Sequence, residues 1–355
     1  MIQLMVLRCW AFVLAAIAFF PASAGAAPET KLVLQAAFPV PSVSLAAVYI
    51  ADQAGFFKEE GLDIEIRFSS GGPQATQITA SGGADLALVT IEPAIQGYEK
   101  GIRGKAFYRY YTRLPFFIAV PADSPVKTAA DLAGKKFGVS NMASSTIVTT
   151  KSTLRSAGLA VTDDAFLPVG IGDSALTALR SGQIQALSLW DSAYASMLRT
   201  GISFRYIYHP TMADFGSGMF FASDSTISTK SAALGRFARA VAKATVLYVE
   251  NPAAALQIYW KANPAAKIGA NEEQARAAGL AEITYMVDTF TLAKKTDKRY
   301  GVQDMEKLQQ YIDMYLEEGV IGARVKAGDI ATDAFVAQAN DFDVEKVRAL
   351  ARAWK

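Results

Sequence analysis

Cysteine and histidine are almost absent from this sequence, which has one of each in 355 residues. Cys9 lies in the apolar N-terminal segment and lacks, just before it, the small residue that precedes a lipid-attachment cysteine. His209 stands alone before Pro210. Disulfides, thiol nucleophiles and cysteine-ligated or paired-histidine metal sites are therefore not expected in the rest of the chain. We predict a protein without a metal and without a cofactor.

An excess of one charge is also lacking. Lys and Arg number 35 against 33 Asp and Glu, and without Arg8 the balance is 34 against 33, a net charge of +1. Nothing in this balance favours binding to nucleic acid. Charged residues make up 19% and hydrophobic residues 52% of the chain, which is typical of a globular protein.

Long apolar runs are missing beyond the first thirty residues. The run Trp10–Phe20 follows Arg8 and precedes the small residues of segment 22–27. It is shorter than the roughly 20 apolar residues that span a bilayer, and the pattern is typical of a secretory signal peptide. We predict a cleaved signal peptide over residues 1–27 and export to the periplasm, with a short membrane anchor as the alternative.

From residue 31 the chain alternates short β-branched runs with helical patterns, which indicates sheets of parallel strands covered by helices. The predicted strands are 31–36, 63–68, 86–89, 106–110, 136–139, 166–169, 184–189 and 204–208. The predicted helices are 44–54, 73–81, 93–100, 145–157, 173–181, 192–199, 230–250, 252–262, 272–287 and 303–318.

These elements predict an α/β fold of two doubly wound lobes. Lobe I comprises residues 28–116 and 218–355, and lobe II comprises residues 117–217. The extended segments 116–120 and 219–223 are predicted to be the crossovers, and a helical C-terminal tail returns to the first lobe. A ligand cleft is then expected between the lobes, at the carboxyl ends of both sheets.

Several motifs occur in an order that points to a family. They are the segment 49–65, which includes Ala-Gly-Phe-Phe-Lys-Glu-Glu-Gly, then Ser81–Asp85, Asp131–Gly134 and Ala178–Ala186, and finally Trp190-Asp191. The set resembles the periplasmic solute-binding proteins of ABC importers for sulfonates, taurine, nitrate and thiamine precursors, of the type II binding-protein class. The chain departs from that pattern at Gly83 and Gln185.

The resemblance implies a non-catalytic, monomeric protein that binds a small molecule by hinge closure. Its implied partners are the ABC permease and ATPase subunits of the inner membrane. Two other functions stay open. An exported dinucleotide-binding enzyme is suggested by segment 169–175, which fits Gly-x-Gly-x-x-Ala, although Asp173 would repel a pyrophosphate. A sensor subunit that reports to a receptor would use the same clamp.

Loops that end a strand and start a helix supply the first candidate ligand contacts. Asn141, Ser144, Ser145 and Thr146 lie in such a loop, and the following helix has no acid in its first turn. Free amide groups and the helix dipole there favour an anion, while a role as a helix cap is the alternative. Gly72 lies in a similar loop, where glycine lets the backbone approach a ligand.

A second set of candidates suits a nitrogen heterocycle or an amine. Thr90 and Glu92 enter one helix, and Trp190 and Asp191 enter another. A carboxylate accepts a hydrogen bond from a ring N–H, and an indole provides a flat contact surface. The alternatives are stabilisation of the helix dipole, a helix cap and core packing.

The remaining candidates are Arg113, Pro39 and Ser42. Arg113 suits a carboxylate or sulfonate, and a solvated arginine is the alternative. Pro39 and Ser42 lie in the loop after the first predicted strand. The sequence therefore leaves open whether the ligand is a small organic anion or a nitrogen heterocycle.

Overall fold

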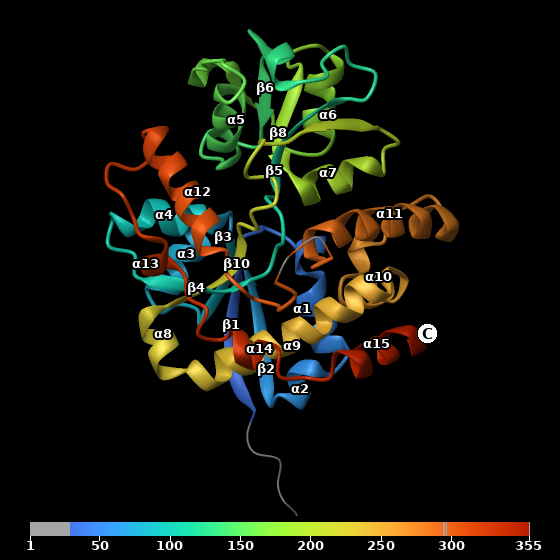
Figure 1. Ribbon diagram of the computed structural model, residues 1–355. Helices are drawn as coiled ribbons and strands as arrows, with labels where there is room; N and C mark the ends of the chain where they lie inside the picture. Colours follow the sequence, from blue (N-terminus) through green and yellow to red (C-terminus); the bar gives the residue numbers. More distant parts are fainter. Residues whose placement is uncertain (1–28, 294, 296, 355) are drawn as a thin grey trace, which may run out of the picture.

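The computed structural model describes residues 29–293, 295 and 297–354, so the predicted signal peptide and Cys9 lie outside the described residues. Two β-sheets, each flanked by helices, form two lobes stacked one above the other (Figure 1). This two-lobed α/β architecture confirms the predicted fold class.

The first sheet lies in the lower lobe of Figure 1 and has the strand order β2-β1-β3-β10-β4. Its strands are β1 (Thr30–Ala36), β2 (Leu62–Phe68), β3 (Leu86–Thr90), β4 (Gly104–Arg109) and β10 (Gly218–Ser223). Strand β1 pairs in parallel with β2 and β3, whereas β10 pairs antiparallel with β3 and β4.

The second sheet repeats this plan in the upper lobe, with the order β7-β6-β8-β5-β9. Its strands are β5 (Phe116–Pro121), β6 (Phe137–Val139), β7 (Phe166–Pro168), β8 (Ala186–Trp190) and β9 (Phe204–Ile207). Strand β6 pairs in parallel with β7 and β8, and β5 pairs antiparallel with β8 and β9. Both sheets are therefore mixed, where the alternation of strands and helices predicted parallel sheets.

The predicted crossovers 116–120 and 219–223 are instead strands within the two sheets, β5 and β10. Both are continuous apolar runs whose residues are buried almost throughout. A strand covered on both faces has this pattern, which explains why each lies inside its sheet rather than between the lobes. The chain passes from one sheet to the other just before these strands, through residues 110–115 and 208–217.

Helices cover both faces of each sheet. Before β9 they are α1 (Ala46–Gln53), α2 (Phe56–Glu59), α3 (Gly72–Ala80), α4 (Glu92–Tyr98), α5 (Thr146–Arg155), α6 (Asp173–Arg180) and α7 (Asp191–Leu198). The short helix α2 was not predicted. Gly55, with φ of 82°, ends α1 in the left-handed region that favours glycine, and the chain re-enters a helix at once.

The C-terminal third is helical, as predicted. It contains α8 (Asp224–Thr229), α9 (Ser231–Glu250), α10 (Pro252–Ala262), α11 (Glu272–Phe290), α12 (Met305–Glu317), α13 (Ala327–Ile330), α14 (Val336–Ala339) and α15 (Val344–Ala353). Helix α9 packs on α1, α2 and α15. At its contact with α2, Phe237 of α9 stacks on Phe57 of α2, with ring centroids 5.4 Å apart. Across the described chain, no helix combines the length and apolar character needed to cross a membrane.

Two helices of the C-terminal tail, which was predicted to return to the first lobe, also contact the second lobe. Helix α11 packs against α7 of the second lobe. Helix α12 reaches α5 of the second lobe, because the Tyr311 hydroxyl lies 3.4 Å from that of Thr149. The Arg155 guanidinium of α5 also lies 2.9 Å from the Glu318 carboxylate, just after α12. The two lobes are therefore joined at both sides by helices as well as by the chain crossings.

Candidate functional site

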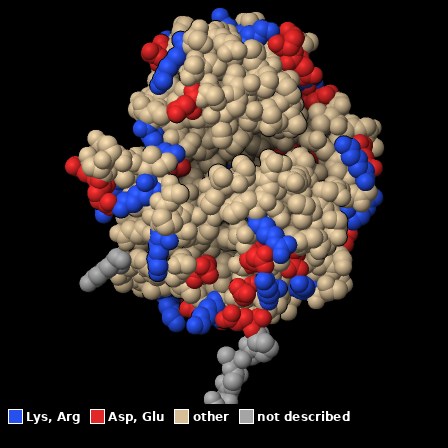
Figure 2. Space-filling model, turned by 180° about the vertical axis from the view of Figure 1, so that it is seen from behind, with Lys and Arg blue, Asp and Glu red and all other residues tan. Residues whose placement is uncertain are grey.

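A cavity of about 670 Å³ lies between the two lobes. Its walls are the loops that follow β1, β2 and β3 in the first sheet and β6, β7 and β8 in the second, together with the crossing that precedes β5. In the space-filling view the same region is a hollow between the upper and lower parts of the molecule (Figure 2). Loops at the carboxyl ends of the parallel strands in both sheets thus face one another, as expected for open α/β sheets.

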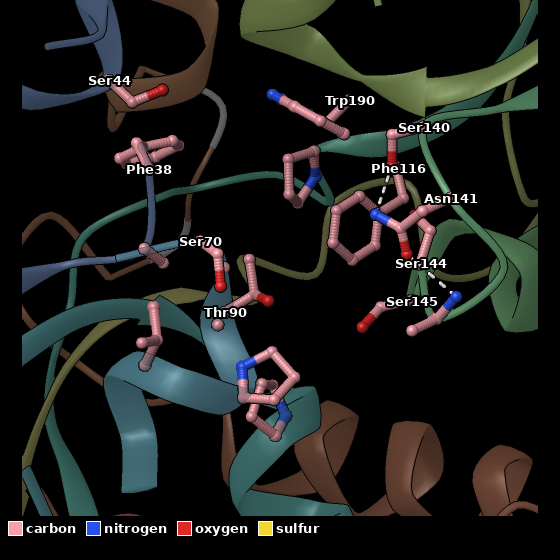
Figure 3. A pocket seen from close by; sticks show the side chains of 18 of the residues that line it. Phe38, Ser44, Ser70, Thr90, Phe116, Ser140, Asn141, Ser144, Ser145 and Trp190 are labelled. Atoms are coloured by element: carbon pink, nitrogen blue, oxygen red, sulfur yellow. Dashed lines mark hydrogen bonds between the residues drawn. The ribbon is translucent and has the colours of Figure 1, made fainter. Parts of the chain in front are cut away.

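Uncharged polar groups gather at one end of the cavity. Ser70 and Thr90 of the first lobe face Ser144 and Ser145 of the second across it (Figure 3). Helices α3 and α5 begin beside these residues, and neither has an acid in its first turn. Their first N–H groups lack intrahelical partners, so this end of the cavity is rich in hydrogen-bond donors.

Local backbone geometry supports this polar end. The Asn141 side chain accepts a hydrogen bond from the Ala143 N–H at 2.9 Å, which fixes the loop before α5. A side-chain carbon on Gly72 would meet the Pro93 ring at 3.0 Å, so glycine allows the start of α3 to lie close to α4.

Aromatic rings form the other end. Phe38 of the first lobe and Trp190 of the second lie on the side of the cavity opposite Ser70, Ser144 and Ser145, and Phe116 lies between them and the polar end (Figure 3). Tyr111 also lines this part. The Ser44 side chain, which is 1% exposed, borders the cavity here, and its hydroxyl has no hydrogen-bond partner within the described residues.

The cavity lining contains one charged residue, Asp191, among the residues that the structure describes. Its carboxylate is already hydrogen-bonded on both oxygens, to the Ser192 N–H at 2.7 Å and to the Thr289 hydroxyl at 2.8 Å. Burial raises the pKa of Asp191, and the nearby Arg113 guanidinium and the Thr289 hydroxyl limit that rise. Asp191 therefore lies in the cavity wall with both oxygens already hydrogen-bonded and almost no surface exposed to solvent.

Glu92 was predicted to contact the ligand, but it does not line the cavity. Its side chain is 0% exposed and points into the packing between α4 and α12, where the Tyr311 hydroxyl donates to Oε1 at 2.8 Å. Burial raises the pKa of Glu92, against the opposing effect of hydroxyl groups that include that of Thr90. An acid at the start of a helix that is covered by a later helix faces the core rather than the cleft.

Arg113 also lies away from the main cavity. It borders a second hollow of about 640 Å³ at the crossing between the lobes, which Tyr206, Tyr208 and Tyr285 also line. Its Nε donates to the Thr289 hydroxyl at 3.2 Å. The guanidinium therefore faces the hydroxyl that bonds Asp191 rather than the cleft.

Two further candidates hold the backbone instead of lining the cavity. The Ser42 hydroxyl accepts a hydrogen bond from the Ser44 N–H at 3.3 Å and caps the short turn Val43–Leu45. The Thr146 hydroxyl donates to the Ser188 carbonyl oxygen at 2.8 Å and is buried. At both positions the hydroxyl bonds a backbone group, as small hydroxyl side chains often do, and is not turned toward a ligand in the cavity.

The remaining eight candidates do line the cavity: Pro39, Gly72, Thr90, Asn141, Ser144, Ser145, Trp190 and Asp191. Sequence reasoning missed the side chains that give the cavity its apolar character and part of its polar rim, namely Phe38, Ser44, Gln74, Tyr111 and Phe116. Most of them stand within three residues of a predicted contact. Proximity along the chain was thus the available signal, although it does not tell which side chains turn inward.

The glycine-rich segment after β7 has the strand, turn and helix order of a dinucleotide fingerprint. Gly170 and Gly172 have φ of 76° and 64°, and α6 starts at Asp173. However, β7 is an edge strand, whereas the fingerprint follows the central strand of a dinucleotide-binding sheet. The Asp191 oxygens are also occupied, so they are not free to bind a ribose.

Comparison with known proteins identifies relatives of the chain. A family model described as "NMT1/THI5 like" matches residues 42–255, which is more than half of the sequence. A curated relative, the "Putative binding protein YtlA" of Bacillus subtilis, is 36% identical over 75 residues. That match covers 21% of this chain and 22% of the relative.

Solved structures share the fold at low identity. The alkanesulfonate-binding protein SsuA of Xanthomonas axonopodis pv. citri, bound to MOPS, superimposes with a TM-score of 0.66 at 18% identity, over 86% of this chain and 99% of that one. The periplasmic nitrate-binding protein NrtA of Synechocystis PCC 6803 gives a TM-score of 0.63 at 13% identity, over 92% and 99% of the two chains. The architecture is therefore that of the periplasmic binding proteins.

Proposed function

Because this chain belongs to the NMT1/THI5-like family, we propose that it is a solute-binding protein, which captures a small organic anion or nitrogen heterocycle between its two lobes and releases it unchanged. The observation that carries the proposal is the interlobe cavity, to which both sheets contribute loops. Its lining combines a mostly apolar wall with a few polar groups, as small-molecule sites generally do. The eight cavity-lining candidates are the proposed ligand contacts.

The proposal includes the cellular setting. The protein is exported through its signal peptide, works in the periplasm, and delivers the solute to the permease and ATPase subunits of an ABC importer. The names of the relatives support this setting, since they include periplasmic and binding proteins. We retain lobe I as residues 28–116 with 218–355 and lobe II as residues 117–217, because β5 to β9 form one sheet and the other strands form the second.

Binding is proposed to shift a hinge equilibrium between open and closed lobes. Segments 110–115 and 208–217 are the proposed hinges, in place of 116–120 and 219–223, because a strand held in a sheet by ladders on both sides cannot absorb a large change of backbone angle. The closed form would be the one that the importer recognises.

A thermal-shift screen of the mature protein over organic anions and heterocycles tests the proposal. A solute at 100 times its dissociation constant should stabilise the folded state by about 2.7 kcal/mol. Small-angle scattering should then show a smaller radius of gyration with that solute than without it. A solute that is chemically altered after incubation, or identical radii with and without a bound solute, would contradict the proposal.

A further inference from the structure

We propose that the solute is an aromatic oxyanion, which is a planar ring that carries one carboxylate or sulfonate group. This inference rests on the proposed function and specifies the ligand of the same cavity. It follows from the separation of the lining into a donor-rich end and an aromatic end, which lie on opposite sides of the cavity (Figure 3).

The donor-rich end suits a group that only accepts hydrogen bonds. The first turns of α3 and α5 and the side chain of Ser145 border this end. The hydroxyls of Ser70 and Ser144 lie there too, but they already donate to Gln74 and Thr146, and the Thr90 hydroxyl bonds Glu92. An oxyanion has several lone pairs and no donor, so it can accept from the free N–H groups at the two helix starts. The absence of an acid in either first turn leaves the dipoles of both helices free to stabilise its charge.

A cationic solute has no counter-charge in the cavity. Asp191 is the one acid in the described lining, and it is 1% exposed with both oxygens hydrogen-bonded to Ser192 and Thr289. A ligand ammonium would have to break these bonds or remain unpaired, which costs free energy in a buried site. The surface around the hollow is also mostly uncharged (Figure 2).

The aromatic end requires a planar body as well as the anionic head. Phe38, Tyr111, Phe116 and Trp190 line it, and stacked or edge-to-face rings contribute about 0.5–1.5 kcal/mol each beyond their buried area. A ring placed here also keeps the anionic head away from Asp191, which follows Trp190 in the chain.

Ser44 gives independent evidence that a bound molecule completes this end. It is 1% exposed, it borders the cavity, and its hydroxyl has no hydrogen-bond partner in the described protein. Buried hydroxyls almost always have a partner. A polar substituent on the ring would satisfy Ser44.

The test is a binding panel on the mature protein, measured by quenching of Trp190 fluorescence and by calorimetry. The probes are benzoate, 2-naphthoate, benzenesulfonate, the neutral amide benzamide, the aliphatic acid cyclohexanecarboxylate, and taurine. The aromatic anions should bind at least ten times more tightly than benzamide, cyclohexanecarboxylate and taurine. Equal affinity for benzamide would overturn the anionic head, and tighter binding of cyclohexanecarboxylate or taurine would overturn the ring.

Asn141→Asp is the sharpest variant, because it adds a negative charge at the donor-rich end without changing the side-chain shape. One carboxylate oxygen can still accept from the Ala143 N–H. The matched control is Asn271→Asp, where an exposed asparagine outside the cavity accepts from the Gln274 N–H at 2.9 Å in the same way. Asn141→Asp should raise the dissociation constant for the aromatic anions at least tenfold, and Asn271→Asp less than twofold. Equal effects would overturn the inference.

The panel also separates this inference from the proposed function. Suppose that no aromatic anion binds with a dissociation constant below about 10 mM, while another solute stabilises and closes the protein. The proposed ligand class is then wrong, and the solute-binding function stands. If no solute of any class binds, both are wrong.

Discussion

Glu92 and Asp191 occupy equivalent places in the two lobes. Each is the first residue of the helix that follows the middle strand of its sheet, β3 in one case and β8 in the other. Each is almost fully buried, at 0% and 1% exposure. Each accepts a hydrogen bond from a C-terminal helix, Glu92 from Tyr311 of α12 and Asp191 from Thr289 of α11.

The two acids differ in their counter-charge. Arg113 stands beside Asp191 and bonds the same Thr289 hydroxyl, and the pKa of Arg113 is raised because the attraction of Asp191 and of neighbouring acidic groups outweighs the effect of burial. No cation contributes to the environment of Glu92, whose second oxygen is buried without a partner in the described chain. Burial raises the pKa of both acids, but for Asp191 the charge of Arg113 opposes that rise, whereas for Glu92 only hydrogen bonds oppose it.

This difference shows that one local pattern can serve two electrostatic purposes. An acid at the start of a helix after a central strand fastens a C-terminal helix in both lobes. In the second lobe a nearby guanidinium, which bonds the same Thr289 hydroxyl, takes part in that fastening, and in the first it depends on hydrogen bonds alone. Substitutions at these residues and at their partners test this contrast.

The largest effect is expected from Asp191→Asn. It removes the counter-charge of a largely buried arginine, so the free energy of unfolding at pH 7 should fall by about 3 kcal/mol in urea denaturation. Glu92→Gln is the matched control and should cost less than about 1 kcal/mol, because the amide resembles a neutral acid. Equal losses would remove the contrast between the two lobes.

The pH dependence of Glu92→Gln is the second prediction. Burial raises the folded pKa of Glu92 above its unfolded value of about 4.3, so the folded state binds more protons in this window. The favourable contribution is complete below about pH 4.3 and is lost as pH rises through the folded pKa. The stability of Glu92→Gln relative to wild type should therefore increase with pH, by at most about 1.4 kcal/mol per pH unit.

Urea denaturation of both proteins across the acidic and neutral range measures this difference. A flat difference across the range would show that the pKa of Glu92 is not raised by folding. A difference that decreases with pH would show that folding lowers the pKa of Glu92 and stabilises it as a carboxylate.

Tyr311→Phe should have a smaller effect, a loss of about 1 kcal/mol. It removes the hydroxyl that joins Glu92 of the first lobe to Thr149 of the second, at 2.8 Å and 3.4 Å. Thr149→Val removes the second of these bonds alone and should cost less. The free energies of unfolding of the two variants give the comparison, and an equal loss in both would place the fastening at Thr149 rather than at Glu92.

The smallest effect is expected at the ion pair between α5 and the end of α12, where the arginine is exposed and the Glu318 side chain is 5% exposed. The Arg155 side chain is 58% exposed, so Arg155→Gln should lower the free energy of unfolding by less than about 0.5 kcal/mol. In the corresponding pair on the α11 side, Arg199 with Glu282 at 3.7 Å, the arginine is 25% exposed, so it loses less to solvent screening and should contribute more. Thermal melting of Arg155→Gln and Arg199→Gln checks the order, which would be reversed if α12 were the stronger bridge.

The elements of the fold could be predicted from local patterns, and so could most of the loops around the cavity. Strand β1 and helix α10 begin and end within one residue of the prediction. The pairing direction of β5 and β10 could not be predicted, because an apolar run fits a central strand of either direction. The site prediction contained the right loops, but it could not distinguish Thr90, which lines the cavity, from Glu92, two residues later, which is buried beneath α12.

The sequence by itself determined where helices and strands start and stop, because capping residues, glycine turns and apolar periodicity act over a few neighbouring residues. Only the tertiary structure decided which side chains face the cavity and which acids are covered. Those outcomes depend on contacts such as Glu92 with Tyr311 and Asp191 with Thr289, which join segments 219 and 98 residues apart. Burial and charge pairing across such separations are set by packing, which no local pattern encodes.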